Sequence, residues 1–154
     1  MIDPPSIIQS EARQTAVIHL TIPRDQIQYV MGPAIQEVMG TLAAQGQSPA
    51  GPVFSLHFNM QPDRFDFEVG VPVSQPIQPT GRVYASTLPA RQALRTIYTG
   101  PYEGLGEGWG EFMEWIYASG HSIANGLWEC YLTGPESSPD PSTWRTELNK
   151  PLVD

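Results

Sequence analysis

Glu129 is the residue of this chain whose type and position best suit chemistry. It lies within residues 127–132, Leu-Trp-Glu-Cys-Tyr-Leu, a short apolar and aromatic run that is typical of a strand. Side chains alternate along a strand, so Glu129 and Tyr131 are predicted to share one face. A carboxylate buried in such a run has to be paired, hydrogen-bonded or shifted in pKa. We therefore predict a binding or catalytic role for Glu129; the alternative is an exposed or purely structural carboxylate.

Four aromatic residues are candidates for the same site. Tyr98, Tyr102 and Tyr131 each combine an apolar ring with a hydroxyl group, which suits flat or cationic ligands. For Tyr98 and Tyr131 the sequence leaves a place outside the groove equally open. Trp109 lies on the apolar stripe of a predicted helix, so core packing is its first expected role and ligand contact its second.

Ser55 and His57 stand 74 residues before the strand glutamate and tyrosine, and we expect them to face the ligand from the first half. A single histidine is more often a hydrogen-bonded polar group than a catalyst. Glu68 and Glu147 occupy equivalent places in the two halves, and a site for one ligand has little use for such a pair, so a structural role is predicted for both. The histidines lack metal-ligand spacing and no nucleotide-binding motif is present, so we expect no metal and no cofactor.

Hydrophobic periodicity indicates which elements would position these residues. Alternation predicts strands at residues 13–22, 54–60, 65–71, 82–88, 93–98, 127–132 and 144–148. A stripe with helical spacing begins at Ile27, but Pro33 interrupts it, so a short first turn and a main helix from about 33 to 45 are predicted. A second helix is predicted between Gly100-Pro101 and Gly120.

The two halves of the chain follow the same plan, and three short matches in order indicate a duplication. We predict an α+β fold of two tandem β-α-β-β units with pseudo-twofold symmetry, in which antiparallel sheets and two main helices flank a central groove. The expected domain covers residues 13–154, with units at about 13–73 and 81–152, after an N-terminal tail at 1–12. The matches are Gly32-Pro33 with Gly100-Pro101; Gly46, Ser48 and Ala50 with Gly120, Ser122 and Ala124; and residues 66–69 and Pro72 with 145–148 and Pro151.

Composition narrows the class of protein. Eight basic residues against sixteen acidic ones give a net charge of -8, which argues against nucleic acid as a partner because phosphates require a basic surface. No apolar run approaches the roughly 18 residues of a membrane span, and no secretory signal is recognisable at the N-terminus. The single cysteine, Cys130, cannot form an internal disulfide, which suits a reducing compartment. We therefore expect a cytoplasmic protein with a small-molecule partner and no membrane contact.

Several motifs resemble those of the GyrI-like effector-binding domain family. They are Tyr-Thr-Gly-Pro-Tyr at 98–102, Trp-Glu-Cys-Tyr-Leu at 128–132, Trp-Arg-Thr-Glu-Leu at 144–148 and Asp-Phe-Glu-Val-Gly-Val-Pro at 66–72. The resemblance covers about residues 13–152. It implies SH2-like tandem units and an aromatic groove in which Glu129 is the pocket glutamate. It also implies binding of lipophilic, often cationic, compounds, as in the ligand-sensing half of bacterial transcription activators and in stand-alone members.

Three functions are compatible with these features. The first is a stand-alone binding protein that holds lipophilic, cationic or aromatic compounds, for which an aromatic groove with one carboxylate suffices. The second is a hydrolase, because the resembled family includes enzymes that open cyclopropane-bearing DNA-alkylating compounds; Glu129 would then act as general base or orient water, with Tyr131 holding the substrate. The third is a gyrase-interacting inhibitor, for which the sequence has no dedicated feature. The sequence leaves the ligand and the oligomeric state open.

Overall fold

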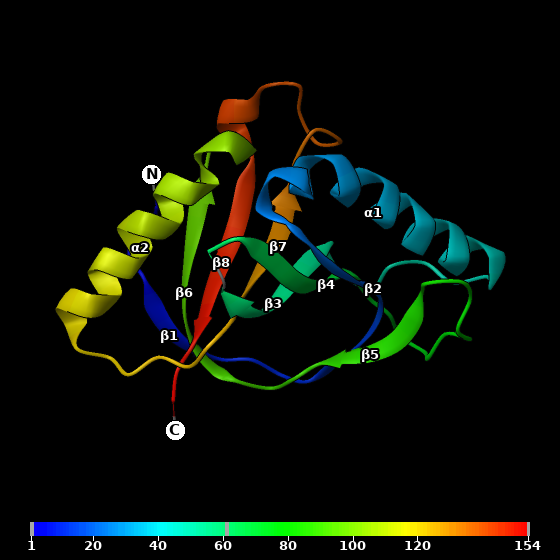
Figure 1. Cartoon of the computed structure of the whole chain (residues 1–154), viewed down its shortest axis with the longest axis horizontal. Coiled ribbons are helices and arrows are strands. Elements are labelled where there is room, and N and C mark those ends of the chain that lie inside the picture. Colours follow the sequence, from blue (N-terminus) through cyan, green and yellow to red (C-terminus); the bar gives the residue numbers. More distant parts are fainter. Residues whose placement is uncertain (1, 61, 154) are drawn as a thin grey trace.

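The computed structural model describes residues 2–60 and 62–153 and has the α+β architecture that the sequence predicts (Figure 1). Within these residues, eight strands form one antiparallel sheet in the order β1-β6-β8-β7-β3-β4-β2-β5. The strands are β1 (Ser6–Gln9), β2 (Arg13–Pro23), β3 (Phe54–Met60), β4 (Arg64–Pro72), β5 (Tyr84–Leu88), β6 (Gln92–Thr99), β7 (Leu127–Thr133) and β8 (Arg145–Pro151). The helices are α1 (Ile27–Ala44) and α2 (Leu105–Ser119), with short 3₁₀ turns η1 (Arg24–Gln26), η2 (Tyr102–Gly104) and η3 (Pro141–Thr143).

Both helices cover the same face of the sheet, and the strand register proves this. Val69 on β4 is paired with Ser55 on β3, Ser55 with Glu129 on β7, and Glu129 with Leu148 on β8. Paired residues in an antiparallel sheet point to the same side. Val69 packs in the cluster under α1 and Leu148 in the cluster under α2. Ser55 and Glu129 therefore lie on the helix-covered face, between the two apolar clusters.

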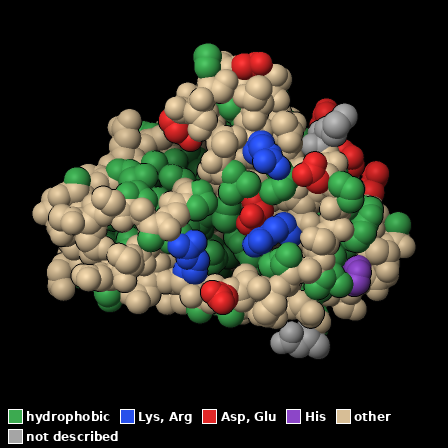
Figure 2. All heavy atoms as spheres, turned by 180° about the vertical axis from the view of Figure 1, so that it is seen from behind, with side chains coloured by type: hydrophobic (Ala, Val, Ile, Leu, Met, Phe, Trp, Pro, Cys, Tyr) green, Lys and Arg blue, Asp and Glu red, His purple; other side chains and the backbone are tan. Residues whose placement is uncertain are grey.

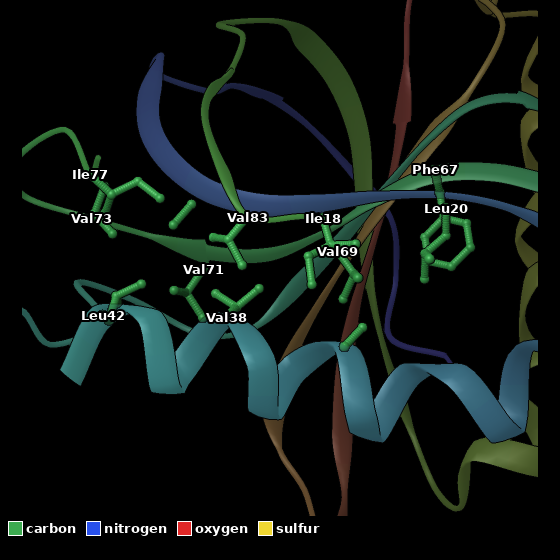
Figure 3. Close-up of a cluster of buried hydrophobic side chains, with 12 residues drawn as sticks. Ile18, Leu20, Val38, Leu42, Phe67, Val69, Val71, Val73, Ile77 and Val83 are labelled. Atoms are coloured by element: carbon green, nitrogen blue, oxygen red, sulfur yellow. The ribbon is translucent and has the colours of Figure 1, made fainter. Parts of the chain in front are cut away.

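The larger apolar cluster lies between α1 and strands β2 and β4, as Figure 3 shows. Val38 and Leu42 of α1 point toward the sheet, which contributes Ile18, Val69 and Val71, and all five side chains are almost completely buried. Burying one such side chain contributes about 1.5–3 kcal/mol. This packing holds α1 across the first half of the sheet.

The predicted break of the first helix at Pro33 is wrong. Helix α1 runs without interruption from Ile27 to Ala44 with Pro33 inside it. Proline removes one backbone hydrogen bond from a helix, but Val30 before it and Ala34 and Val38 after it pack against the same cluster. The apolar stripe therefore continues through the proline, and its burial outweighs the lost bond.

The first of the three repeat matches is also misplaced. Gly100-Pro101 follows β6 and precedes the turn η2, whereas Gly32-Pro33 lies inside α1. The segment that precedes the corresponding turn η1 in the first half is the end of β2, which closes with Pro23. Local sequence likeness misled here because both dipeptides fall near a helix start.

The N-terminal segment, predicted from the sequence to be a tail, carries an edge strand. Residues of β1 pair with residues 92–95 of β6, and Ile2 forms a bridge with Tyr98. The Thr96 hydroxyl donates to the carbonyl of Asp3 over 2.6 Å. These bonds hold the segment against the second half of the sheet. No helix of the described residues is long and apolar enough to cross a membrane.

Candidate functional site

The carboxylate of Glu129 lies at the centre of the helix-covered face and is 9% exposed. Trp109 of α2 donates its indole Nε1–H to Glu129 Oε2 over 2.6 Å. The hydroxyl of Tyr131, two residues further along β7, donates to Glu129 Oε1 over 2.8 Å. The alternation of β7 therefore places the carboxylate and the phenol side by side, as the sequence predicts, and α2 supplies the third group.

Ser55 completes this polar cluster from the other half of the chain. It is directly paired with Glu129 across the β3–β7 ladder and is fully buried. Its Oγ lies 2.8 Å from the Tyr131 hydroxyl oxygen. Because Tyr131 donates its proton to Glu129, its oxygen is free to accept the hydrogen of Ser55. Glu129, Trp109, Tyr131 and Ser55, called the central cluster from here on, thus form one connected hydrogen-bond network.

The electrostatics of the central cluster follow from its burial. Burial raises the pKa of the Glu129 carboxyl from its ordinary value of 4.5, and the hydrogen bonds from Trp109, Tyr131 and Ser55 oppose this shift. Burial also raises the pKa of the Tyr131 hydroxyl well above 10, and the neighbouring Glu129 raises it further. Tyr131 therefore remains a proton donor, and ionised Glu129 is a costly charge.

Aromatic rings border the central cluster on one side. The ring of Tyr102, from η2, lies 6.0 Å from that of Tyr131 and 5.0 Å from that of Trp144. Trp144 stands just before β8, and its indole donates to the carbonyl of Ser138 over 2.9 Å. Trp144 is not among the site residues predicted from the sequence, because only the fold brings the end of the long loop before β8 beside η2.

Tyr98 does not join the site. It is 4% exposed and packs in the cluster under α2, where its hydroxyl donates to the carbonyl of Pro101 over 2.8 Å. Its ring lies so close to the backbone of α2 and of the turn before it that a Cβ added at Gly108 would come within 2.7 Å of it. The structure therefore gives Tyr98 a core role, the alternative that the sequence had left open.

His57 lies on the same strand as Ser55 but is separate from the central cluster. Its ring stacks on Phe67 at a centroid distance of 4.8 Å and meets the edge of Phe65 at 5.3 Å. It is 5% exposed, and its Nδ1 atom has no hydrogen-bond partner. Burial, assisted by the charge of Arg24, lowers the pKa of His57 from 6.5 to about 4. His57 is thus a neutral, buried ring.

The thiol of Cys130 is not activated, and the described residues contain no metal-binding cluster. Burial, together with the charge of Glu147, raises the pKa of the Cys130 thiol to about 12, so almost no thiolate forms at neutral pH. Among the described residues, no group of three or more His, Cys, Asp or Glu side chains is placed to hold a metal ion.

Two cavities open on the far face of the sheet, the face away from α1 and α2. One has a volume of about 250 Å³ and the other about 560 Å³, and Leu88 and Trp128 line both. Neither is lined by Glu129, Trp109 or Tyr131. Figure 2 shows the molecule from behind, where hydrophobic side chains and charged side chains of both signs gather around a central hollow.

A single sheet under two helices, with a buried carboxylate between the helices and aromatic rings beside it, has the features of a small-molecule-binding domain. The chain belongs to the family of the GyrI-like small molecule binding domain, whose model matches residues 3–152. No curated protein matches the sequence significantly.

Solved structures share this fold at low sequence identity. The C-terminal domain of EcmrR is 21% identical, with a TM-score of 0.85 and a match covering 98% of both chains. In the EcmrR–DNA complex, at 22% identity and a TM-score of 0.84, the match covers 98% of this chain but 57% of the EcmrR chain. SAV2435 bound to tetraphenylphosphonium is 13% identical (TM-score 0.72; coverage 98% of this chain, 94% of that one). A hydrolase encoded by lin2189 from Listeria innocua is 12% identical (TM-score 0.65; 97% and 91%).

Proposed function

We propose that this domain binds lipophilic organic cations between α1 and α2, with Glu129 as the counter-charge. The observation that carries the proposal is the set of partners of Glu129: a buried carboxylate whose hydrogen bonds come from the neutral groups of Trp109 and Tyr131. Among the described residues, no ion pair includes Glu129. Buried charges are normally paired, so a cationic ligand would supply the missing partner.

The aromatic rings support a cationic and largely apolar ligand. The ring of Tyr102 lies 6.0 Å from that of Tyr131 and 5.0 Å from that of Trp144, and Tyr131 donates to the carboxylate. The π-face of an aromatic ring attracts a cation by about 0.5–2 kcal/mol. Rings also bury the hydrophobic groups of a ligand efficiently. The fold likeness to SAV2435, solved with tetraphenylphosphonium, agrees with this ligand class.

Binding requires the central cluster to open. Glu129 is 9% exposed, and Trp109, which covers it and donates to one of its oxygens, is only partly buried. A ligand that reaches the carboxylate therefore displaces the indole of Trp109, which is held by one hydrogen bond and by its contact with Phe112 at 5.6 Å. Tyr131 is held more firmly, because Ser55 also bonds to it. We infer that Trp109 is the movable cover of the site.

The duplication predicted from the sequence belongs to the same proposal, with the pseudo-twofold axis passing between Ser55 and Glu129. These two residues, which the 74-residue offset makes equivalent, are directly paired. Both halves also have a bulge at the corresponding point of β3 and β7. The register shifts at His57/Asn59 and at Tyr131/Thr133 are equivalent in this way. The backbone hydrogen bond from Ala50 N to Pro72 O likewise corresponds to the one from Ala124 N to Pro151 O. The site is then lopsided, with its charge supplied by one half.

Calorimetric titration with tetraphenylphosphonium and with neutral triphenylphosphine oxide tests the proposal. We expect the wild type to prefer the cation, and Glu129→Gln to weaken cation binding by about tenfold or more while changing the affinity for the neutral compound little. Glu111→Gln, on the exposed side of α2, removes the same charge without touching the site and serves as the control. Equal affinities of wild type and Glu129→Gln for the cation would refute the role of Glu129.

A hydrolytic activity is the second candidate, and the raised pKa of Glu129 favours it, because a carboxylate with a raised pKa is a stronger general base. The substrate would be a strained electrophile such as a cyclopropane-bearing alkylating compound, opened by water that Glu129 activates. Incubation with such a compound, followed by chromatography of the ring-opened product, separates the two functions. Turnover that is lost in Glu129→Gln supports an enzyme, whereas binding without turnover in the wild type supports a receptor.

A further inference from the structure

Glu68 lies on the far face of the sheet and lines the cavity of about 250 Å³ there. It is 6% exposed, although glutamate is seldom buried without a partner. Its side-chain partners are neutral: the Tyr84 hydroxyl donates to Oε2 over 2.5 Å, and the Ser86 hydroxyl lies 3.2 and 3.3 Å from the two oxygens. Both partners come from β5. A carboxylate offers about four acceptor positions, so these contacts leave it able to bind a further donor.

Arg91 lines the same cavity and carries the opposite charge. The ion pairs among the residues that the structure describes are His19–Asp66, Arg82–Glu37, Arg95–Glu147 and Arg145–Asp3. They include neither Glu68 nor Arg91. One small cavity is therefore lined by a buried carboxylate and a guanidinium that form no ion pair with each other or with another side chain of the described residues.

The second half of the sheet has a glutamate at the corresponding point, and there the charge is neutralised internally. Glu147 on β8 pairs with Arg95 at 3.1 Å and accepts a bond from Asn149 over 3.1 Å. Arg95 and Asn149 face each other across β6 and β8. In the first half, the positions equivalent to Arg95 and Asn149 are occupied by Val17 and Gly70, which are paired across β2 and β4. Gly70 follows Glu68 by two residues, as Asn149 follows Glu147. The first half thus keeps the carboxylate and lacks the cation.

We propose that this cavity is a second small-molecule site, and that its ligand is a free α-amino acid with an apolar side chain. The ammonium group would bind Glu68 and the carboxylate Arg91. The side chain would lie against Leu56, Leu88 and Trp128, which line the cavity with them. The volume of about 250 Å³ lies below the roughly 300–1,000 Å³ of sites for drug-sized ligands, which favours a ligand of this small size.

Calorimetric titration at pH 7 with L-phenylalanine and L-leucine tests the proposal. Each amino acid is compared with two analogues that keep only one of its charges. For phenylalanine these analogues are phenethylamine, which lacks the carboxylate, and 3-phenylpropionate, which lacks the ammonium group. We expect at least one of the two amino acids to bind about tenfold more tightly than both of its analogues, because each lost charge removes a charge-assisted hydrogen bond. If neither amino acid binds in the millimolar range, or if an analogue with one charge binds as tightly as the amino acid, the proposal fails.

Two variants assign the binding to the cavity. Glu68→Gln keeps the shape of the side chain and should weaken amino-acid binding about tenfold. Arg91→Gln should weaken binding by a similar factor. Because Arg91→Gln does not disturb the buried network around Glu68, it remains informative if Glu68→Gln fails to fold. Glu147→Gln, outside this cavity, should leave the affinity within about twofold. Wild-type affinity in Arg91→Gln would overturn the site. Glu68→Gln should still bind tetraphenylphosphonium like the wild type, so failure at one site is distinguishable from failure at the other.

Discussion

Trp109 donates its indole N–H to the buried carboxylate of Glu129 over 2.6 Å, and this single bond links helix α2 to the central strand β7. Without this bond, the buried Glu129 carboxylate would lose the hydrogen-bond partner of its Oε2 atom. The bond also fixes the position of the residue that we infer to be the cover of the ligand site. In the proposed site, stability and ligand access therefore depend on the same contact.

Trp109→Phe keeps an aromatic ring but removes the donor. We expect the free energy of unfolding to fall by about 1–3 kcal/mol at pH 7, since a buried acceptor loses a hydrogen bond. Urea denaturation followed by circular dichroism measures this. Trp115→Phe on the same helix, where the side chain is 38% exposed and its ring contact is with His121, should change the value by less than about 0.5 kcal/mol. Equal effects of the two variants would contradict the role of the bond.

His57 should make the protein less stable in mild acid. Its pKa is lowered from 6.5 to about 4 in the folded state, mainly by burial. The unfolded chain therefore binds a proton more readily between pH 6.5 and 4, and the stability present above pH 6.5 is lost as the pH falls through that range, by about 3 kcal/mol in total. The difference in unfolding free energy between wild type and His57→Phe, measured across this range, isolates the effect. A difference that stays constant with pH would contradict it.

Glu129 should act in the opposite sense. Because burial raises its pKa above the ordinary 4.5, the folded protein holds this proton more tightly than the unfolded chain does. The contribution of Glu129 to stability is therefore fully present below the unfolded pKa and is lost as the pH rises through the folded pKa. In urea titrations from pH 4 to 8, the free energy of unfolding of the wild type should fall relative to that of Glu129→Gln as the pH rises. A gain for the wild type over that range would show that the hydrogen bonds outweigh burial.

Gly70 marks a point where two strands approach too closely for a side chain. A Cβ at this position would overlap the carbonyl oxygen of Ala16 and lie 2.8 Å from the Cα of Val17. Both obstacles are backbone atoms, so we expect Gly70→Ala to cost about 3 kcal/mol or more. Gly40→Ala, on the exposed side of α1 with nothing within 4 Å, should instead stabilise the protein by about 0.5–1 kcal/mol. Thermal unfolding should therefore give a lower midpoint temperature for Gly70→Ala than for the wild type, and a higher one for Gly40→Ala.

The sequence by itself determined most of the elements, β1 excepted, and the facing of their residues. Alternation between apolar and polar residues in β2, β3, β4 and β7 is a local property, and it placed Glu129 and Tyr131 on one face because the side-chain period of a strand is two. The helical stripes were equally local, although Pro33 led to a false break, because the burial that carries α1 through the proline is a tertiary effect.

Tertiary structure alone decided which residues meet. Trp109 reaches Glu129 from another element, Trp144 comes to Tyr102 at the end of a long loop, and Tyr98 packs in the core and not beside the central cluster. None of these contacts follows from spacing along the chain, because each depends on how a helix or loop crosses the sheet. The same holds for the unpaired charge of Glu68, since the missing cation becomes evident only when the paired strands are set side by side.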